Sequence, residues 1–168
     1  GLEMTDLGNV SRFLARYGHM FLWCAEIGWL SWDGRRWARA GADNALMRAV
    51  QTTVRCIADE AVALAKSDMD TEFKPPERSK PAVMLSDKLA AWCLASQAAS
   101  KVNCIAGLAR SYLAVIKAQL DADPNMLNVR NGTLHLNGKG ELFYEFREHD
   151  PADLITKLAG THYDPDAD

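Results

Sequence analysis

Residues 127–136 read Leu-Asn-Val-Arg-Asn-Gly-Thr-Leu-His-Leu, and they give the clearest local indication of structure in the chain. An Asn-Gly pair is a strong signal for a two-residue hairpin turn, because both residues tolerate positive φ. Apolar and polar residues alternate on either side of the pair, which is typical of paired strands. The sequence therefore predicts an antiparallel hairpin whose turn is Asn131-Gly132. One predicted face holds Leu127, Val129, Leu134 and Leu136, and the other, expected to face solvent, holds Asn128, Arg130, Thr133 and His135.

A second pair of this kind, Asp33-Gly34, lies inside an aromatic-rich stretch. A two-residue turn at this pair would place Trp32 opposite Arg35. Residues 21–27 are expected to add a third strand. Alternation would then gather Leu30, Trp32, Arg35, Trp37 and Arg39 on one face.

Most of the remaining chain has apolar residues at helical spacing. Helices are predicted over 6–17, from Asp43 or Asn44 to about 66, from Ser86 onward, and over 97–119. The second of these has its apolar stripe at Met47, Val50, Val54, Ile57, Ala61 and Leu64. A short helix is expected over 149–158, with Asp150 as its cap and Gly160 as its stop. Residues 67–85 contain three prolines and are expected to form a charged loop. The predicted fold class is α+β, predominantly helical, with a helical core and two small antiparallel β-hairpins.

Composition and charge limit the possible function classes. The chain has 168 residues and a formal net charge of −3, and 48% of its residues are hydrophobic. Residues 1–110 have 14 Lys/Arg against 12 Asp/Glu, and residues 111–168 have 5 against 10. This balance disfavours DNA binding as the sole task. Residues 1–3 are interpreted as a cloning remnant, 4–160 as one domain and 161–168 as a linker. No apolar run approaches the roughly 20 residues of a membrane span.

Motifs of known catalytic sites are missing from the sequence. There is no G-x-x-x-x-G-K-[ST], no G-x-S-x-G and no H-E-x-x-H. The four cysteines (Cys24, Cys56, Cys93 and Cys104) form no C-x-x-C pair and have no histidine at ligand spacing. They are expected to be small buried thiols. No catalytic, cofactor-binding or metal-ligating residue is predicted.

The pair Asp121-Ala-Asp123 allows two interpretations. In a strand, this spacing would place both carboxylates on one face, as in centres that hold two Mg²⁺ for nucleotidyl transfer. The pair precedes Pro124 and follows a predicted helix end, where acidic residues commonly form turns. The structural interpretation is favoured.

Arginines and tryptophans interleave around the first predicted hairpin. Arginine contacts phosphate and tryptophan stacks on unpaired bases, so the combination suits single-stranded DNA. Alternatively, the tryptophans pack the core, and Trp32 forms a cation–π pair with Arg35. The candidate DNA-binding residues are Arg35, Arg36, Arg39, Trp32 and Arg130.

The order of these motifs resembles a known domain. The similarity rests on Thr5-Asp-Leu-Gly-Asn-Val-Ser-Arg-Phe13, on residues 28–37 and 120–136, on His149-Asp-Pro-Ala-Asp-Leu-Ile-Thr-Lys157, and on residues 163–167. Together they resemble the helical domain that precedes the superfamily-3 helicase domain in phage, plasmid and poxvirus-type primase–helicases. The resemblance covers nearly the whole chain and is weakest over 67–85.

The resemblance implies a place in a larger replication protein. A primase or another module often precedes this domain, and an ATP-driven hexameric helicase with its own P-loop comes after it. The helicase is expected to begin after Asp168, and ATP and Mg²⁺ are expected to bind there. The family's catalytic residues belong to those neighbours.

The expected function is that of an accessory domain that supports assembly or orientation of the helicase in DNA replication. Alternatively, the domain binds single-stranded or forked DNA and feeds it to the helicase. Expected partners are the helicase domain of the same polypeptide, DNA and, in the full-length protein, further copies of the chain. The expected location is the cytoplasm of a bacterial host, with no membrane contact.

Overall fold

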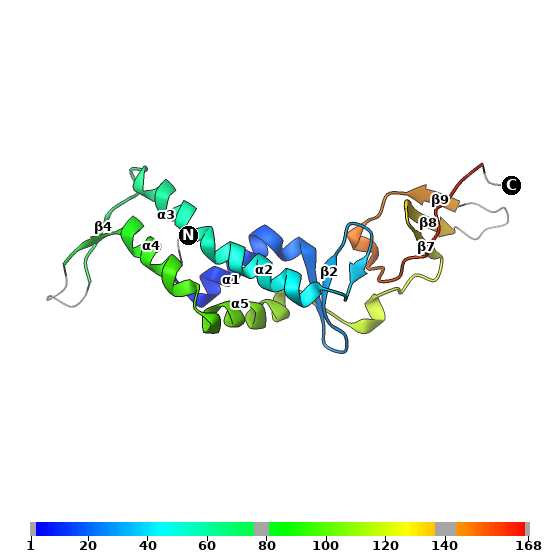
Figure 1. Ribbon diagram of the computed structural model, residues 1–168, viewed down its shortest axis with the longest axis horizontal. Helices are drawn as coiled ribbons and strands as arrows, with labels where there is room; N and C mark the ends of the chain where they lie inside the picture. Colours follow the sequence, from blue (N-terminus) through cyan, green and yellow to red (C-terminus); the bar gives the residue numbers. More distant parts are fainter. Residues whose placement is uncertain (1–2, 76–80, 137–143, 167–168) are drawn as a thin grey trace. The chain divides into compact units, whose positions relative to one another are not determined.

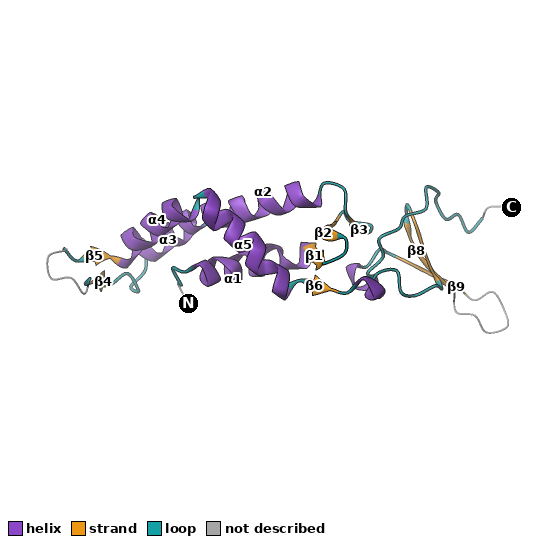
Figure 2. Cartoon of the chain, turned by 90° about the horizontal axis from the view of Figure 1, so that it is seen from below, coloured by secondary structure: helices purple, strands orange, loops and turns teal. Residues whose placement is uncertain are grey.

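The computed structural model describes residues 3–75, 81–136 and 144–166, which form two compact units (Figure 1). The first, here called the helical unit, comprises Gly1–His19 and Asn44–Tyr112. The second, here called the strand-rich unit, comprises Met20–Asp43 and Leu113–Asp168. The helical unit consists of helices and one two-stranded sheet, and the strand-rich unit has two small, mainly antiparallel sheets (Figure 2). The α+β prediction is therefore confirmed.

The helical unit pairs its helices along their lengths. Its helices are α1 (Asp6–Tyr17), α2 (Ala42–Arg55, which begins just outside the unit), α3 (Ile57–Ala65), α4 (Leu85–Ser96) and α5 (Ala99–Tyr112). A 3₁₀ turn, η1 (Gly18–Met20), comes after α1. Helix α1 packs along α5, and α3 packs along α4 (Figure 1). Thr5 caps α1 by accepting a hydrogen bond from the amide of Gly8 at 2.9 Å. The prediction of this first helix is confirmed.

The predicted long helix from residue 43 or 44 to 66 is broken in two. Its apolar stripe is buried from Val50 to Leu64, as expected, but helix α2 ends at Arg55 and α3 begins at Ile57. Buried Thr53 bonds back to the carbonyl of Ala49, an interaction that often bends helices. The Cys93 thiol also donates to the Val54 carbonyl at 3.3 Å, immediately before the break.

The prediction of a plain loop over 67–85 is partly wrong. Strands β4 (Glu72–Phe73) and β5 (Val83–Met84) pair antiparallel, and residues 76–80 lie outside the described residues. The prolines lie between the two strands and therefore remove none of their hydrogen bonds. Ser86 is not the cap of α4, because the helix begins at Leu85 and Met84 is its N-cap. The amide and hydroxyl of Ser86 instead donate to the Asp70 carboxylate, at 2.9 and 2.6 Å.

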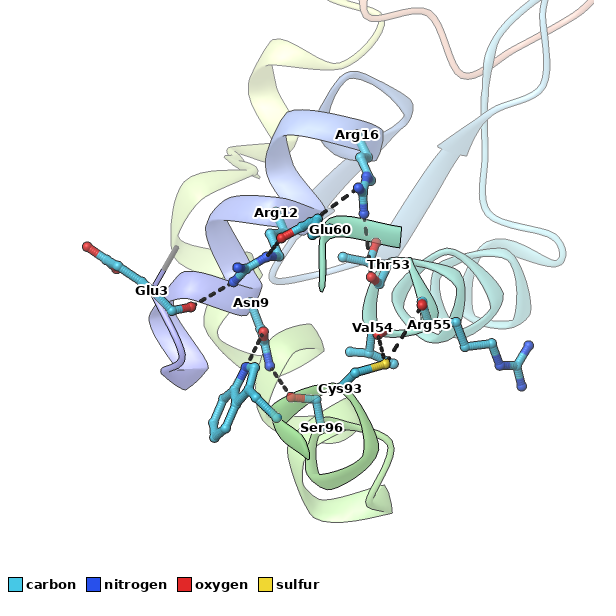
Figure 3. Close-up of polar contacts among 11 residues, drawn as sticks. Glu3, Asn9, Arg12, Arg16, Thr53, Val54, Arg55, Glu60, Cys93 and Ser96 are labelled. Atoms are coloured by element: carbon cyan, nitrogen blue, oxygen red, sulfur yellow. Dashed lines mark hydrogen bonds and ion pairs between the residues drawn. The ribbon is translucent and has the colours of Figure 1, made fainter. Parts of the chain in front are cut away.

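A fully buried asparagine joins α1 to α4 (Figure 3). The Asn9 amide nitrogen donates to the Ser96 hydroxyl at 2.9 Å, and its oxygen accepts from the Trp92 indole at 3.1 Å. Close by, Arg12 and Arg16 both pair with Glu60, at 2.8 and 3.3 Å (Figure 3). Buried polar groups need such partners to offset their loss of hydration.

The first sheet of the strand-rich unit is built around the aromatic stretch. Its strands are β1 (Phe21–Cys24), β2 (Gly28–Trp32), β3 (Trp37–Ala38) and β6 (Ala114–Val115), in the order β3-β2-β1-β6. The helix predicted over 97–119 therefore ends at Tyr112, because β6 joins the sheet parallel to β1. A 3₁₀ turn, η2 (Lys117–Gln119), comes next. Buried Cys24, Leu30, Trp37 and Leu120 form the core beneath.

The second sheet contains the Asn-Gly hairpin. Its strands are β7 (Met126–Val129), β8 (Gly132–Leu136) and β9 (Tyr144–Arg147), in that order (Figure 1). Val129 pairs with Gly132, so the turn is Arg130-Asn131 and the predicted turn is displaced by one residue. Each residue of β7 therefore pairs two positions away from its predicted partner, for example Leu127 with Leu134 rather than Leu136. Because side chains alternate with a period of two, the same residues still share each face. Residues 137–143, between β8 and β9 in the sequence, lie outside the described residues.

The predicted helix over 149–158 is a single turn, η3 (Pro151–Asp153). Asp150 caps it as expected, by accepting from the amide of Ala152 at 2.8 Å. The turn ends at Leu154, whose φ is 53°, and not at Gly160. The next two residues bond elsewhere: Ile155 accepts from the Trp37 amide, and Thr156 binds Asp121. Among the described residues, no helix is long and apolar enough to span a bilayer.

Candidate functional site

The loop of the first hairpin differs from the predicted two-residue turn. Trp32 pairs with Trp37, so the loop contains four residues, 33–36, and Arg35 lies in it rather than opposite Trp32. The Asp33 carboxylate accepts from the amides of Arg35 and Arg36, each at 2.9 Å. An aspartate that bonds the backbone two residues on stabilises this wider turn, and Gly34 alone takes positive φ, at 92°. The cation–π alternative for Trp32 and Arg35 is therefore wrong.

Two of the candidate arginines are held by the protein itself. Nη1 of Arg36 donates to the Thr156 carbonyl at 3.3 Å, and its Nε lies 3.6 Å from Asp33. Arg39 donates to the Ile27 carbonyl at 3.0 Å and to Asp43 at 2.5 Å. Both side chains thus fasten one loop or strand to another.

The candidate tryptophan is also engaged in packing. Trp32 is half-buried against the core, with its ring centroid 5.5 Å from that of Trp37. Trp37 is buried, and its indole donates to the Pro151 carbonyl at 2.8 Å. The face of this hairpin is therefore largely occupied by its own aromatic contacts.

Arg35 and Arg130 are both exposed. Within the described part of the chain, neither side chain has a hydrogen bond or ion pair. Arg35 is in the first hairpin loop, and Arg130 is in the turn of the second. These two of the five candidate residues are available for an external ligand.

Asn128 connects the two loops, although alternation along the strand predicted it on a solvated face. Its side chain is 4% exposed and makes four contacts. The amide nitrogen donates to the carbonyls of Arg35 and Lys157, at 2.9 and 3.0 Å. The oxygen accepts from the Thr133 hydroxyl at 3.2 Å and lies 2.8 Å from Nδ1 of His149. Since both amide hydrogens are donated, His149 must carry its proton on Nδ1.

Because Asn128 binds backbone near several basic residues, it collects them in one region. Arg35 and Lys157 contribute the two carbonyls, and His149 contacts the amide directly. Arg130 is in the turn that begins just after β7, and its carbonyl lies 3.5 Å from Nε2 of His149. The Lys157 side chain is 83% exposed and lies 3.9 Å from Asp121. Alternation alone could not reveal this cluster, because its members come from segments far apart in the sequence.

The next segment, residues 159–163, is fastened along β7. Ala159 donates to the Asn128 carbonyl at 2.8 Å, and the Arg130 amide donates to the Thr161 carbonyl at 2.9 Å. The Asn131 side chain then donates to the Tyr163 carbonyl and accepts from its amide, each at 2.9 Å. We call residues 159–163 with these partners the C-terminal clamp.

Aromatic contacts complete the clamp. The Tyr163 ring lies 4.8 Å from that of Phe146 and 5.5 Å from that of Tyr144, between centroids. The two tyrosine hydroxyls are hydrogen-bonded, and this bond raises the pKa of Tyr163 to about 12. On the same strand, Arg147 pairs with Asp153 at 2.5 Å, which raises the pKa of Arg147.

Asp121 and Asp123 hold backbone in place. Asp121, with φ of 51°, accepts from the amide and hydroxyl of Thr156, at 2.8 and 2.6 Å. Asp123 accepts from the Asn125 amide at 2.9 Å and lies 3.4 Å from His135. They are not on one strand face, so the geometry on which the two-metal hypothesis rested is not present. Among the described residues there is no group of three or more His, Cys, Asp or Glu placed to hold a metal ion.

Comparison with known families identifies the class of protein that this arrangement belongs to. The family described as D5 N terminal like matches residues 10–168, which covers both units. The chain belongs to this family, whose members precede the superfamily-3 helicase in primase–helicases. The predicted resemblance is thereby confirmed. No curated protein matches the chain.

Proposed function

We propose that this domain orients the helicase domain that comes after it in the parent primase–helicase. The C-terminal clamp supports the proposal. It fastens residues 159–163 through backbone bonds to β7, two side-chain bonds from Asn131 and the aromatic contacts of Tyr163. A chain segment held at several points fixes the direction in which the next domain leaves it, whereas an unattached linker does not.

The proposal is tested in the full-length parent protein with the clamp weakened. Asn131→Ala combined with Tyr163→Ala removes both side-chain bonds and the aromatic contacts but leaves the strands intact. We expect hexamer assembly or DNA unwinding per ATP hydrolysed to fall several-fold. Asn125→Ala with Tyr112→Ala is the matched control, because both side chains are exposed and lie outside the clamp. Unchanged assembly and unwinding in the clamp variant would contradict the proposal.

A second candidate function is contact with single-stranded or forked DNA through Arg35 and Arg130. Their exposure, and the two further basic residues that Asn128 gathers beside them, support this proposal. Each lost phosphate contact weakens binding and lowers the salt slope by about one. Fluorescence anisotropy with labelled forked DNA at about 50 and 200 mM salt measures both quantities.

Arg35→Ala with Arg130→Ala is expected to reduce affinity and flatten the salt dependence. Arg48→Ala, an exposed arginine of α2, is the matched control. Equal binding by the double variant and the unaltered chain would exclude this surface. Arg36, Arg39 and Trp32 are less suited to DNA contact, since their side chains already have partners within the strand-rich unit.

A further inference from the structure

A groove of about 610 Å³ runs between α3 and α4 of the helical unit. Much of its lining is alanine: Ala58, Ala61, Ala65 and Ala90. How closely two helices approach depends on the size of the side chains at the contact. An alanine-lined groove therefore leaves room for another helix.

Two larger apolar side chains line the same groove and are exposed. Leu94 of α4 is 74% exposed and Val62 of α3 is 55% exposed. Such side chains act as knobs, and the alanines beside them form a matching hollow. One surface thus carries both halves of a helix–helix contact, which is the requirement for packing against a copy of itself.

The groove also carries opposite charges at its two ends. Cys93 contacts the carbonyls of Val54 and Arg55, so Arg55 lies beside the C-terminal half of α4. Asp87 is in the first turn of α4, next to Ser86, which binds Asp70 beyond the end of α3. The two helices therefore run in opposite directions. Both Arg55 and Asp87 are exposed and line the groove, and within the described residues neither side chain has an ion pair.

We propose that the α3/α4 face binds a second copy of this chain about a two-fold axis. A two-fold rotation exchanges the ends of the groove, so Arg55 of each copy meets Asp87 of the other. Leu94 and Val62 of each copy enter the alanine-lined hollow opposite. The charge pattern favours a second copy as the partner, because the positive end of the groove in one copy lies against the negative end in the other.

This contact differs from the one that closes a helicase ring. A two-fold interface uses the same patch on both copies and ends with the pair, whereas a ring needs two different patches on each subunit. The proposal therefore goes beyond the orienting function and does not depend on it.

The area of the α3/α4 face limits the expected affinity of the dimer. Helix α4 has 12 residues and is about 18 Å long, so two such helices cover less than the roughly 800 Å² per partner of a standard interface. We expect a dimer that dissociates in the micromolar range. It should be visible by sedimentation velocity when the 168-residue chain is followed from about 1 to 500 µM.

The first variant places a charge on the larger knob. Leu94→Glu is expected to abolish the dimer over the whole concentration range. Leu7→Glu is its matched control, because Leu7 is a leucine of α1 that is 56% exposed and does not line the groove. Circular dichroism checks that both variants keep their helix content. A chain that stays monomeric at the highest concentration, or a dimer that Leu94→Glu leaves intact, would overturn the proposal.

A charge exchange tests the two-fold geometry itself. Arg55→Asp and Asp87→Arg are each expected to weaken the dimer about five- to tenfold, because each change creates two repulsive pairs per dimer. The double variant restores opposite charges and should recover the dimer to within about twofold. Arg48→Asp, on α2 away from the groove, controls for net charge. A double variant as weak as the worse single variant would refute the reciprocal pairing.

Discussion

The two hairpins begin from nearly the same signal and fold differently. Asp33-Gly34 opens into a four-residue loop, whereas the turn at Asn131-Gly132 moves back by one residue to Arg130-Asn131. Asp33 binds the backbone of its own turn, at the amides of Arg35 and Arg36. Asn131 binds Tyr163, 32 residues away. The partner of the Asx side chain, and not the dipeptide, decides which turn forms.

The two glycines differ in the same way. Gly34 has φ of 92° and open space where a Cβ would lie. Gly132 has no positive φ, but a Cβ there would lie 2.5 Å from the Arg147 carbonyl oxygen and 2.6 Å from the Phe146 ring. The first glycine serves the turn, and the second permits close approach of β9. A sequence pattern does not separate these two reasons for glycine.

We expect the largest loss of stability at Asn128, whose side chain forms hydrogen bonds with both hairpins. Asn128→Ala removes the side chain that binds the first loop through Arg35 and the second hairpin through Thr133. Buried groups left without partners cost about 1–3 kcal/mol, so we expect a loss of about 3 kcal/mol. Urea unfolding followed by tryptophan fluorescence measures it, because four of the five tryptophans are in the strand-rich unit. Asn125→Ala should change the free energy of unfolding by less than about 0.5 kcal/mol, and equal losses would contradict the role of Asn128.

The next largest losses of stability are expected at the two glycines, and they should differ between Gly132 and Gly34. Gly132→Ala forces apart β8 and β9, and overpacking of this kind costs about 2 kcal/mol. Gly34→Ala meets no neighbouring atom and loses only the energy of its positive φ, about 1 kcal/mol. The same urea unfolding ranks them, and a larger loss for Gly34→Ala would reverse the comparison.

A smaller effect is expected at the Asx side chain of the first loop. Asp33→Ala removes the acceptor for two backbone amides and should cost about 1 kcal/mol. Near-ultraviolet circular dichroism should also change, because Trp32 and Trp37 pair at the base of this loop. Asp68→Ala, at an exposed residue outside the loop, is the control and should leave both signals unchanged.

The smallest expected effect is on how the stability of the second hairpin depends on pH. The hydrogen bond that the Tyr163 hydroxyl donates to the Tyr144 hydroxyl raises the pKa of Tyr163 to about 12, above the ordinary value of 10.0. The folded state therefore holds this proton more tightly, so the bond's contribution is complete below pH 10 and is lost as pH rises toward 12. Tyr163→Phe should make stability fall less steeply over this range, and Tyr112→Phe should not. Parallel pH profiles for all three proteins would contradict the assignment.

Sequence patterns correctly predicted the elements that are determined by residues close together in the chain. The first helix, the buried stripe from Val50 to Leu64 and the cap at Asp150 all result from spacing and capping chemistry. The break at Cys56, the short turn ending at Leu154 and the strand after Tyr112 depend on partners far along the chain. Asn128 was misplaced for the same reason: a polar residue in an alternating strand is buried only when distant groups satisfy it.

Amide hydrogen exchange of residues 159–163 is the most direct test of the proposed orienting function, because that proposal requires the C-terminal clamp to hold this segment in place. We expect the amides of Ala159 and Tyr163 to be protected in the unaltered chain. Asn131→Ala should remove the protection of Tyr163 and leave that of the β7–β8 pair. If both amides of the unaltered chain exchange at the rate of an unstructured peptide, the clamp does not hold this segment in solution and cannot orient the next domain.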